Sequence, residues 1–197
     1  EIFLREIISN ASDACDKLCY QALTDESVGM SRKDFAIHIT VDKDARTLTV
    51  SDNGIGMDQA DLENNLGIIA SSGSYRFKQE VGDDAKDTDV IGQFGVGFYS
   101  AFMVADKITV VTKKYGAESG YTWVSSGADG YTITPCDKES VGTDIIMHIK
   151  EDTEDEKYSE FLESWRLQEL VRKYSDYIRF PCLLYTSDAA DERSSVD

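Results

Sequence analysis

Glu6 and Asn10 are two polar side chains whose spacing allows them to work together. They stand four residues apart in a stretch without a helix breaker, so both are expected on one face of a helix. An amide oxygen such as that of Asn10 is a suitable Mg²⁺ ligand when phosphate oxygens and waters complete the shell. A carboxylate one turn away, such as that of Glu6, can orient and deprotonate an attacking water. Polar pairs with this spacing are usually exposed surface residues. Whether Glu6 and Asn10 have a chemical role therefore depends on the other motifs in the chain.

The segment from Asp52 to Gly56 has the sequence Asp-Asn-Gly-Ile-Gly, which is common in turns. In a dry pocket, Asp52 could accept a hydrogen bond from the exocyclic amine of a purine. Such a pair is specific, because losing either partner leaves the other buried and unpaired. Taken alone, this segment fits a plain turn and a base-binding turn equally.

A second segment carries Gly92, Gly95 and Gly97 and continues into an apolar helical stretch. Glycine lets the backbone approach an anion closely, and the first turn of a helix offers free N–H groups. The glycine spacing is neither that of the dinucleotide-binding Gly-x-Gly-x-x-Gly pattern nor that of a P-loop, so these two phosphate loops are excluded. A tight loop without a ligand explains the segment alone about as well.

The composition is that of a globular, acidic protein. Its 197 residues are 41% hydrophobic, which is enough for one sizeable domain with a core. The net charge of −17 argues against a broad surface for nucleic acid or an anionic membrane, whereas a nucleotide needs only local donors. The sequence shows neither a membrane-spanning apolar run nor a signal peptide. Glu1 already lies in a helical pattern, so we expect a fragment that lacks its true N-terminus.

The cysteines and histidines do not form the pattern of a metal site. Cys15 and Cys19 have helical spacing, but there is no Cys-x-x-Cys pair, and both histidines, His38 and His148, fall in strand-like runs. A metal site built from these residues is therefore not expected. We expect reduced, mostly buried thiols, as in a cytoplasmic protein.

Hydrophobic periodicity predicts a helix, a hairpin and further helices, followed by an antiparallel meander. The predicted helices cover residues 1–20, 58–69, the apolar stretch through residue 104, and 158–178. The predicted strands cover residues 35–41, 47–51, 108–114, 120–125, 131–135 and 143–150. Residues 71–90 are predicted to be a loop. This order predicts an α/β (α+β) two-layer sandwich, in which helices cover one face of a mixed, mostly antiparallel sheet.

Residues 182–197 are a candidate artefact. Cys182 to Glu192 look like the translation of a transposon-end adapter used in preparing DNA libraries, so we set this tail aside when predicting the fold. The prediction is that DNA recloned from the source diverges after Pro181.

The motifs occur together in an order that resembles one family, the bacterial (HtpG) type of heat-shock protein 90 chaperones, within the GHKL ATPases. Residues 1–14 resemble the first motif of that family, and residues 51–57 and 91–100 resemble the second and third. Residues 142–145 resemble its last motif, and 165–176 its exit toward a middle domain. The resemblance spans residues 1–181 and includes the non-glycine positions of each motif.

The resemblance implies an ATP-binding (Bergerat) fold at 1–150, a lid at about 67–92 and an exit helix at 151–181. It implies that ATP and Mg²⁺ bind, with Glu6 as the general base, Asn10 holding Mg²⁺ and phosphate, and Asp52 binding the adenine amine. The other residues implied to contact the nucleotide are Asp13, Gly56, Met57, Asn65, Leu66, Gly95, Val96, Gly97, Phe98 and Thr143.

The resemblance also implies how such a domain is used. In the family, ATP binding and lid closure drive a homodimer that remodels unfolded or partly folded client proteins in the cytoplasm. The catalytic Arg of the family lies in the middle domain, so the chain alone is expected to bind ATP or ADP and to hydrolyse ATP weakly. No nucleic-acid or membrane partner is expected. Ser71 stands where members often carry Lys, which affects the expected lid contacts rather than nucleotide binding.

Two alternatives stay open. DNA gyrase B subunits, MutL-type repair proteins and sensor histidine kinases have similar pockets, although their first motif lacks the form seen at residues 5–14. A catalytically inactive interaction domain is the other alternative, and the intact Glu6, Asn10 and Asp52 count against it.

Overall fold

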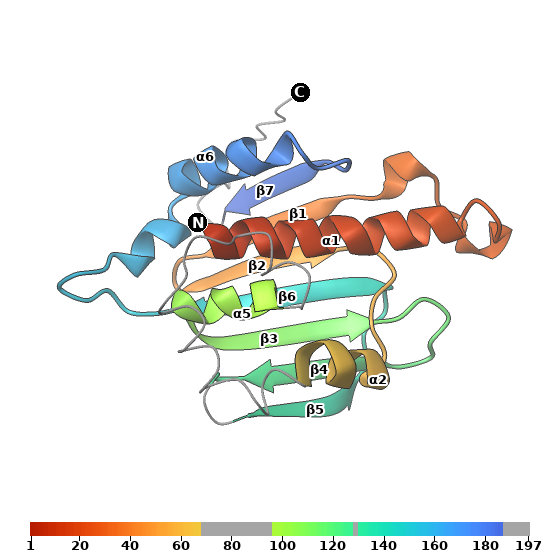
Figure 1. The fold of residues 1–197 in the computed structure, drawn as a ribbon, viewed down its shortest axis with the longest axis horizontal. Helices are drawn as coiled ribbons and strands as arrows, with labels where there is room; N and C mark the ends of the chain where they lie inside the picture. Colours follow the sequence, from red (N-terminus) through yellow and green to blue (C-terminus); the bar gives the residue numbers. More distant parts are fainter. Residues whose placement is uncertain (68–95, 128–129, 187–197) are drawn as a thin grey trace.

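The computed structural model describes residues 1–67, 96–127 and 130–186 (Figure 1). Within these ranges the strands form one seven-stranded sheet in the order β5-β4-β3-β6-β2-β1-β7. Neighbouring strands are antiparallel, except for β1 and β7, which are parallel. The strands are β1 (Ile37–Asp42), β2 (Thr47–Asp52), β3 (Ala105–Lys113), β4 (Gly120–Ser125), β5 (Tyr131–Cys136), β6 (Gly142–Ile149) and β7 (Cys182–Thr186). The prediction of a mixed, mostly antiparallel sheet is confirmed.

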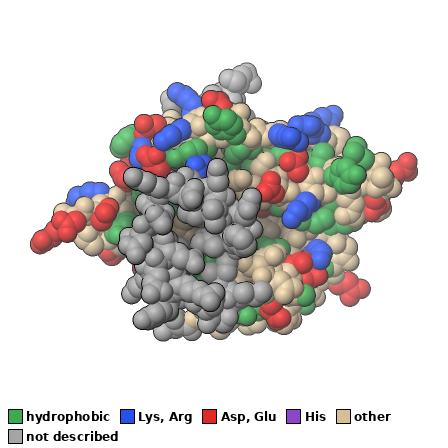
Figure 2. All heavy atoms as spheres, viewed as in Figure 1, with side chains coloured by type: hydrophobic (Ala, Val, Ile, Leu, Met, Phe, Trp, Pro, Cys, Tyr) green, Lys and Arg blue, Asp and Glu red, His purple; other side chains and the backbone are tan. Residues whose placement is uncertain are grey.

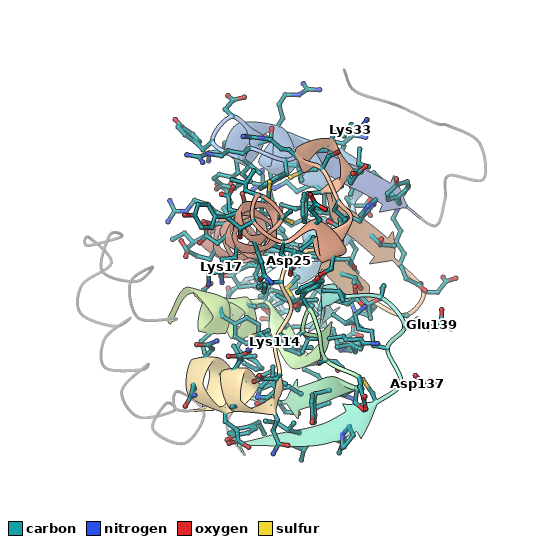
Figure 3. All side chains as sticks on the ribbon, turned by 90° about the vertical axis from the view of Figure 1, so that its right-hand side faces the viewer. Lys17, Asp25, Lys33, Lys114, Asp137 and Glu139 are labelled. Atoms are coloured by element: carbon teal, nitrogen blue, oxygen red, sulfur yellow. The ribbon has the colours of Figure 1, made fainter. Side chains whose placement is uncertain are left out.

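The described helices cover one face of this sheet. The longest, α1 (Ile2–Gln21), runs along β1 and β2, and α6 (Ser164–Ser175) lies beside it. The short α2 (Gln59–Leu62) and α5 (Val96–Tyr99) lie over β3 and β4 (Figure 1). The side view in Figure 3 shows the helices on one side and the strands on the other. This arrangement is the predicted two-layer sandwich.

Helix α1 forms where the sequence predicts it, because its apolar residues recur every three to four positions. This spacing gives one apolar face that packs into the core over the sheet. The buried residues of α1 are Phe3, Leu4, Ile7, Ile8, Ala11, Ser12, Cys15 and Leu18. The cysteines of the described residues are free thiols, of which Cys15 is buried and the other three partly buried.

The prediction that the last four predicted strands form a meander is wrong for the fourth of them, β6. β3, β4 and β5 do follow one another, but β6 returns past β3 and pairs with both β3 and β2. The burial patterns explain the order. β6 is buried at alternate residues from Thr143 to Ile149, as suits the middle of a sheet. β5 has no fully buried residue and contains Pro135, as suits an outer strand.

The predicted C-terminal helix is interrupted. Residues 158–162 form a short 3₁₀ helix, η6 (Tyr158–Leu162), and α6 begins only at Ser164. Glu163 separates them because its backbone is extended, with φ −89° and ψ 127°. The predicted helix 58–69 is likewise divided into α2 and a π-helical turn, η3 (Glu63–Gly67), and the rest of it lies outside the described residues.

The tail that was set aside contributes an edge strand. Cys182–Thr186 form β7 and pair in parallel with β1 from Ile37↔Cys182 to Val41↔Thr186. Leaving these five residues out of the predicted fold was therefore wrong, since an apolar run beside an open sheet edge can add a strand. The proposed adapter origin of the tail stays a prediction. Among the described residues, no helix is both long and apolar enough to span a bilayer.

Candidate functional site

Asp52 is the last residue of β2 and the centre of the candidate site. It follows Leu48 and Val50 on the helix-covered face of the sheet, because alternate residues of a strand point to the same side. One carboxylate oxygen, Oδ1, accepts a hydrogen bond from the backbone N–H of Gly54 at 2.9 Å. Burial raises the pKa of Asp52 to about 7, and the nearby Asp144 adds to the rise, while the N–H groups of Gly54 and Thr143 and the charge of Lys138 oppose it. As a residue Asp52 is partly buried, and a carboxylate that is partly withdrawn from water in this way is suited to an amine donor.

The turn after Asp52 is held against α1. The N–H of Ile55 donates to the carbonyl oxygen of Ala14 at 3.0 Å, and a side chain on Gly54 would collide with the backbone of Ala14 and Cys15. Glycine is therefore required at residue 54 for close approach to the helix.

Asn53 anchors the other side of this turn. Its Oδ1 accepts a hydrogen bond from the N–H of Ala36 at 3.0 Å, and its Nδ2 donates to the carbonyl oxygen of Asp34 at 2.8 Å. Asn53 thus stabilises the turn, because both polar atoms of its side-chain amide are hydrogen-bonded to the backbone that leads into β1.

Gly56 and Met57 lie against the end of β3. Gly56 has φ +69°, and a side chain there would strike the backbone of Lys113. The N–H of Met57 donates to Oγ1 of Thr112 at 2.9 Å, and the N–H of Tyr115 donates to the carbonyl oxygen of Ile55 at 2.8 Å. The five-residue turn is therefore fixed by α1 on one side and by β3 on the other.

Three polar residues form a row across the sheet. Asp52 of β2 is opposite Thr143 of β6, which in turn is opposite Thr112 of β3. Thr112 and Thr143 are buried, and their hydroxyl oxygens are 2.9 Å apart. Thr112 was not predicted from the sequence, because its place beside Thr143 depends on the unexpected pairing of β6 with β3.

Glu6 lies where α1 meets α5. Its side chain is 13% exposed, and its Oε1 is 3.3 Å from Nη2 of Arg5. Gly97 in the first turn of α5 is packed so closely that a side chain there would overlap the Glu6 carboxyl group. The structure thus brings together Glu6 and Gly97, which the sequence analysis selected in separate motifs, although they are distant in sequence.

Asn10 and Asp13 follow Glu6 on α1 and are exposed to solvent. Each is therefore free of the core and open to a ligand or to water. On the visible face in Figure 2, Lys and Arg side chains are interspersed with Asp and Glu over α1 and α6 rather than gathered into one patch.

The residues predicted to contact a nucleotide near the third motif differ in their exposure to solvent. Asn65 is exposed on η3, and Met57 is partly buried against the core. The Phe98 ring is buried and packs edge-on against the rings of Tyr99 and Trp123, with centroids 5.7 and 5.6 Å away. Phe98 can therefore offer a ligand its backbone but not its ring.

Leu66 is also buried, and its carbonyl oxygen accepts a hydrogen bond from the Tyr99 hydroxyl at 2.6 Å. Gly95 and the greater part of the predicted lid lie outside the described residues, as does Ser71. Val96 begins α5, and its side chain is likewise not described.

Lys114 stabilises the start of α2 and was not selected in the sequence analysis. Its Nζ is 2.9 Å from Oδ2 of Asp58 and 2.8 Å from Oδ2 of Asp61 (Lys114 is labelled in Figure 3). Asp58 and Asp61 also form a capping box at the start of α2. The Asp-x-x-Asp spacing could have predicted the cap, but the cation is 53 to 56 residues away in the chain.

A second feature near α1 is a large open groove. It has a volume of about 740 Å³ and runs between α1 and the end of α6, where Glu6 and Asp13 contribute to its wall with Arg179 and Tyr177. Asp52, Met57 and Thr143 do not line it. We place the candidate site at Asp52 because a shielded carboxylate in a rigid turn offers specific chemistry, whereas the groove is open and of mixed charge.

In the described residues, the sheet, the helical layer on one of its faces and the turn closed between α1 and β3 form a two-layer α/β sandwich. The sequence pattern of the family described as histidine kinase-, DNA gyrase B-, and HSP90-like ATPase matches residues 1–152. The chain belongs to this family.

Curated relatives narrow the family further. The chain is 61% identical to the chaperone protein HtpG of Bacillus velezensis over 182 residues, which is 92% of this chain and 29% of that protein. It is 62% identical to HtpG of Halalkalibacterium halodurans over the same length, and 53% identical to HtpG of Clostridium acetobutylicum over 196 residues. The chain spans about three tenths of the length of these relatives. The resemblance to the heat-shock protein 90 chaperones is confirmed, and the gyrase, MutL and kinase alternatives are not favoured.

Proposed function

We propose that this chain binds ATP and ADP at the site around Asp52, as the nucleotide-binding part of an HtpG-type chaperone. The observation that carries the proposal is the shielded Asp52 carboxylate, held beside Thr143 in a turn that α1 and β3 fix in place. A buried carboxylate gains most from a ligand that donates a hydrogen bond to it, as the 6-amino group of adenine does.

The rest of the nucleotide would be held by α1 and by the segments around α5. In this proposal Gly56, Met57 and Thr143 line the base pocket, and Asp13, Asn65, Leu66, Val96 and Phe98 contribute to the sugar and phosphate contacts. Phe98 would act through its backbone, because its ring belongs to the core. The role of Gly95 is proposed from the family resemblance alone.

Asn10 is a suitable holder for Mg²⁺. Its amide is exposed on α1, one turn from Glu6, and Mg²⁺ needs only one or two protein oxygens when phosphates and waters complete its shell. Among the described residues there is no cluster of three or more His, Cys, Asp or Glu side chains that could hold a metal. In this proposal the ion enters with the nucleotide and neutralises phosphate charge.

Glu6 is the proposed general base for ATP hydrolysis. Its carboxylate would take a proton from a water as that water forms a bond to the γ-phosphorus, while the bond from this phosphorus to the β–γ bridging oxygen breaks and ADP leaves. The Arg5 ion pair and the contact with Gly97 hold the carboxylate at the junction of α1 and α5. Because the chain is a fraction of its relatives, fast turnover is proposed to need parts that lie beyond it.

The chaperone cycle is proposed at the level of the whole protein. The relatives are chaperones by name, and we infer that nucleotide binding here, with closure of residues 67–92 as a lid, drives a homodimer that acts on unfolded or partly folded proteins in the cytoplasm. No nucleic-acid or membrane partner is proposed.

Titration calorimetry of the chain with ADP and Mg²⁺ tests the proposal. Binding at micromolar to millimolar concentration is expected for the native protein, and none for Asp52→Asn. Glu6→Gln serves as the matched control, because it should keep ADP binding and lose only the residual ATP turnover. An Asp52→Asn protein that binds ADP as well as the native protein does would contradict the placement of the base.

A further inference from the structure

Strand β7 is an outer strand of the sheet, and its far side is open. Its only neighbour among the described strands is β1, and β7 stands at one end of the sheet (Figure 1). Its sequence, Cys-Leu-Leu-Tyr-Thr, contains neither a charged residue nor a proline. Such residues normally protect edge strands, because an open edge can pair with another chain. The outer strand at the other end, β5, has this protection in Pro135.

The peptide groups of β7 point alternately toward β1 and away from it. The N–H of Ile37 donates to the carbonyl oxygen of Pro181 at 2.9 Å, and this bond fixes which residues of β7 pair with β1 in the parallel ladder. Leu183 and Tyr185 therefore direct their peptide groups to β1. The residues that direct theirs to the open side are Cys182, Leu184 and Thr186. Among the described residues, no strand lies on that side to pair with them.

The side chains of β7 add apolar surface to this open edge. Cys182 and Leu184 pack against the core, so Leu183 and Tyr185 lie on the opposite face of the sheet. These two side chains are 39% and 50% exposed. The ring of Tyr185 stacks on that of His38 in β1, with centroids 5.6 Å apart, which holds it beside the sheet. The edge thus combines free peptide groups with two exposed apolar side chains at alternate residues.

We propose that two copies of this chain associate by antiparallel pairing of β7 with β7, around a two-fold axis at Leu184. In this register Leu184 lies opposite its own copy, and Leu183 of each chain lies opposite Tyr185 of the other. The outward peptide groups of one copy then meet those of its partner, and the exposed leucine and tyrosine side chains cover each other. No like charges are brought together along the strands, because β7 has none.

A second copy suits this edge better than an unrelated extended peptide does, because β7 is its own complement. The leucine–tyrosine contact occurs twice in the pairing, and contacts of this kind between opposite side chains stabilise antiparallel strands. The pairing uses the β7 edge of both copies, so it closes at a dimer. Only five residues of each copy take part, and the net charge of −17 opposes association, so the dimer is expected to be weak.

This inference depends on the residues of β7 as they stand in the chain, whatever the origin of the tail. It is also independent of the proposed nucleotide binding.

Sedimentation velocity of the full chain tests the pairing. At high salt, which screens the negative charge, the native protein should change from monomer to dimer between about 10 µM and about 1 mM. Tyr185→Lys should weaken the dimer by roughly tenfold or more, because charged edge residues block pairing. The matched control is Thr134→Lys, which places the same charge on an exposed residue of β5 and should leave the dimer unchanged. A native chain that stays monomeric throughout, or a dimer that both substitutions weaken equally, overturns the proposal.

Leu183→Glu in combination with Tyr185→Lys tests the register. Each substitution alone removes an apolar partner and should weaken the dimer. In the antiparallel register, the two together place a carboxylate of each copy opposite an ammonium group of the other, and such opposite charges attract across strands. The double variant should therefore dimerise more tightly than either single variant. An additive loss in the double variant overturns the proposed pairing.

Amide hydrogen exchange, followed by NMR on the native chain, gives a result that does not depend on the folding of any variant. The amide of Leu184 points to the open side, so its exchange should slow several-fold as the concentration rises and the dimer forms. The amide of Leu183 is already paired with β1 and should change much less. Exchange at Leu184 that is independent of concentration overturns the proposal even where sedimentation shows a dimer, because that dimer then uses another surface.

Discussion

The hydroxyl of Tyr99 donates a hydrogen bond to the carbonyl oxygen of Leu66 at 2.6 Å. Tyr99 ends α5 and Leu66 belongs to η3, so one buried bond joins the two segments that flank residues 68–95. Burial also raises the pKa of the Tyr99 hydroxyl well above its usual value, so it remains a donor at all physiological pH values.

Tyr99→Phe should lower the free energy of unfolding by about 1 kcal/mol, because the Leu66 carbonyl loses its partner while the ring keeps its packing. Urea denaturation measures the change. The control is Tyr121→Phe, which removes a hydroxyl for which the described residues show no hydrogen bond. Equal effects of the two substitutions would mean that the Tyr99–Leu66 bond contributes nothing.

Asp52→Asn should stabilise the protein without nucleotide at high pH. The folded-state pKa of about 7 is raised from 3.8, so the folded protein keeps a proton that the unfolded chain releases. The stability associated with that proton is fully present below about pH 4 and is lost as the pH rises through 7, a loss on the order of 4 kcal/mol. The uncharged amide avoids this loss. Thermal unfolding from pH 4 to pH 8 should therefore show Asp52→Asn gaining on the native protein as the pH increases, and a constant difference would contradict the shielding of Asp52.

Ligand affinity should depend on pH in the opposite direction. The ionised carboxylate accepts the hydrogen bond from the amine, so binding should be strongest above pH 7 and should weaken roughly tenfold for each pH unit below it. Adenosine is the suitable ligand, because it has no phosphate that titrates in this range. Calorimetric titrations at pH 6, 7 and 8 measure the slope, and an affinity that stays flat or increases toward pH 6 would exclude Asp52 as the acceptor.

Gly56→Ala should be far more harmful than the same change at Gly116. Both glycines have positive φ, at +69° and +82°, but only Gly56 faces a neighbour, the backbone of Lys113. Gly116→Ala should cost roughly 1 kcal/mol from backbone strain, and Gly56→Ala roughly 3–5 kcal/mol because a collision is added. Chemical denaturation gives both values, and nucleotide titration of the folded fraction should show lost binding only for Gly56→Ala. Equal destabilisation would show that the turn can move away from β3.

The sequence predicted the individual elements better than it predicted their neighbours. The bounds of α1 and of β4 follow from residue patterns within each segment, and both are close to the predicted ranges. The place of β6 between β3 and β2 could not be predicted in this way, because alternation shows which face of a strand is buried but not which strands lie beside it.

The same limit applies to the site. Asp52 and Thr143 belong to recognisable motifs and were selected, and the structure places them opposite each other. Thr112 lies in an ordinary alternating strand, and its importance depends on contacts with residues 31 and 55 positions away. The burial of the Phe98 ring could not be predicted from the sequence either, because its aromatic partner Trp123 comes from β4.

The central position of β6 has a consequence for folding. Strands β1 and β2 form a local hairpin, but β2 meets β6 only after the chain has continued through β3, β4 and β5. Closing such a long loop is slow, because contacts distant in sequence cost more chain entropy before they give any gain. We therefore expect the row of Asp52, Thr143 and Thr112 to assemble late in the folding of the sheet. A partly folded chain should have no nucleotide affinity, so during refolding the recovery of ADP binding should lag behind the formation of the β1–β2 hairpin.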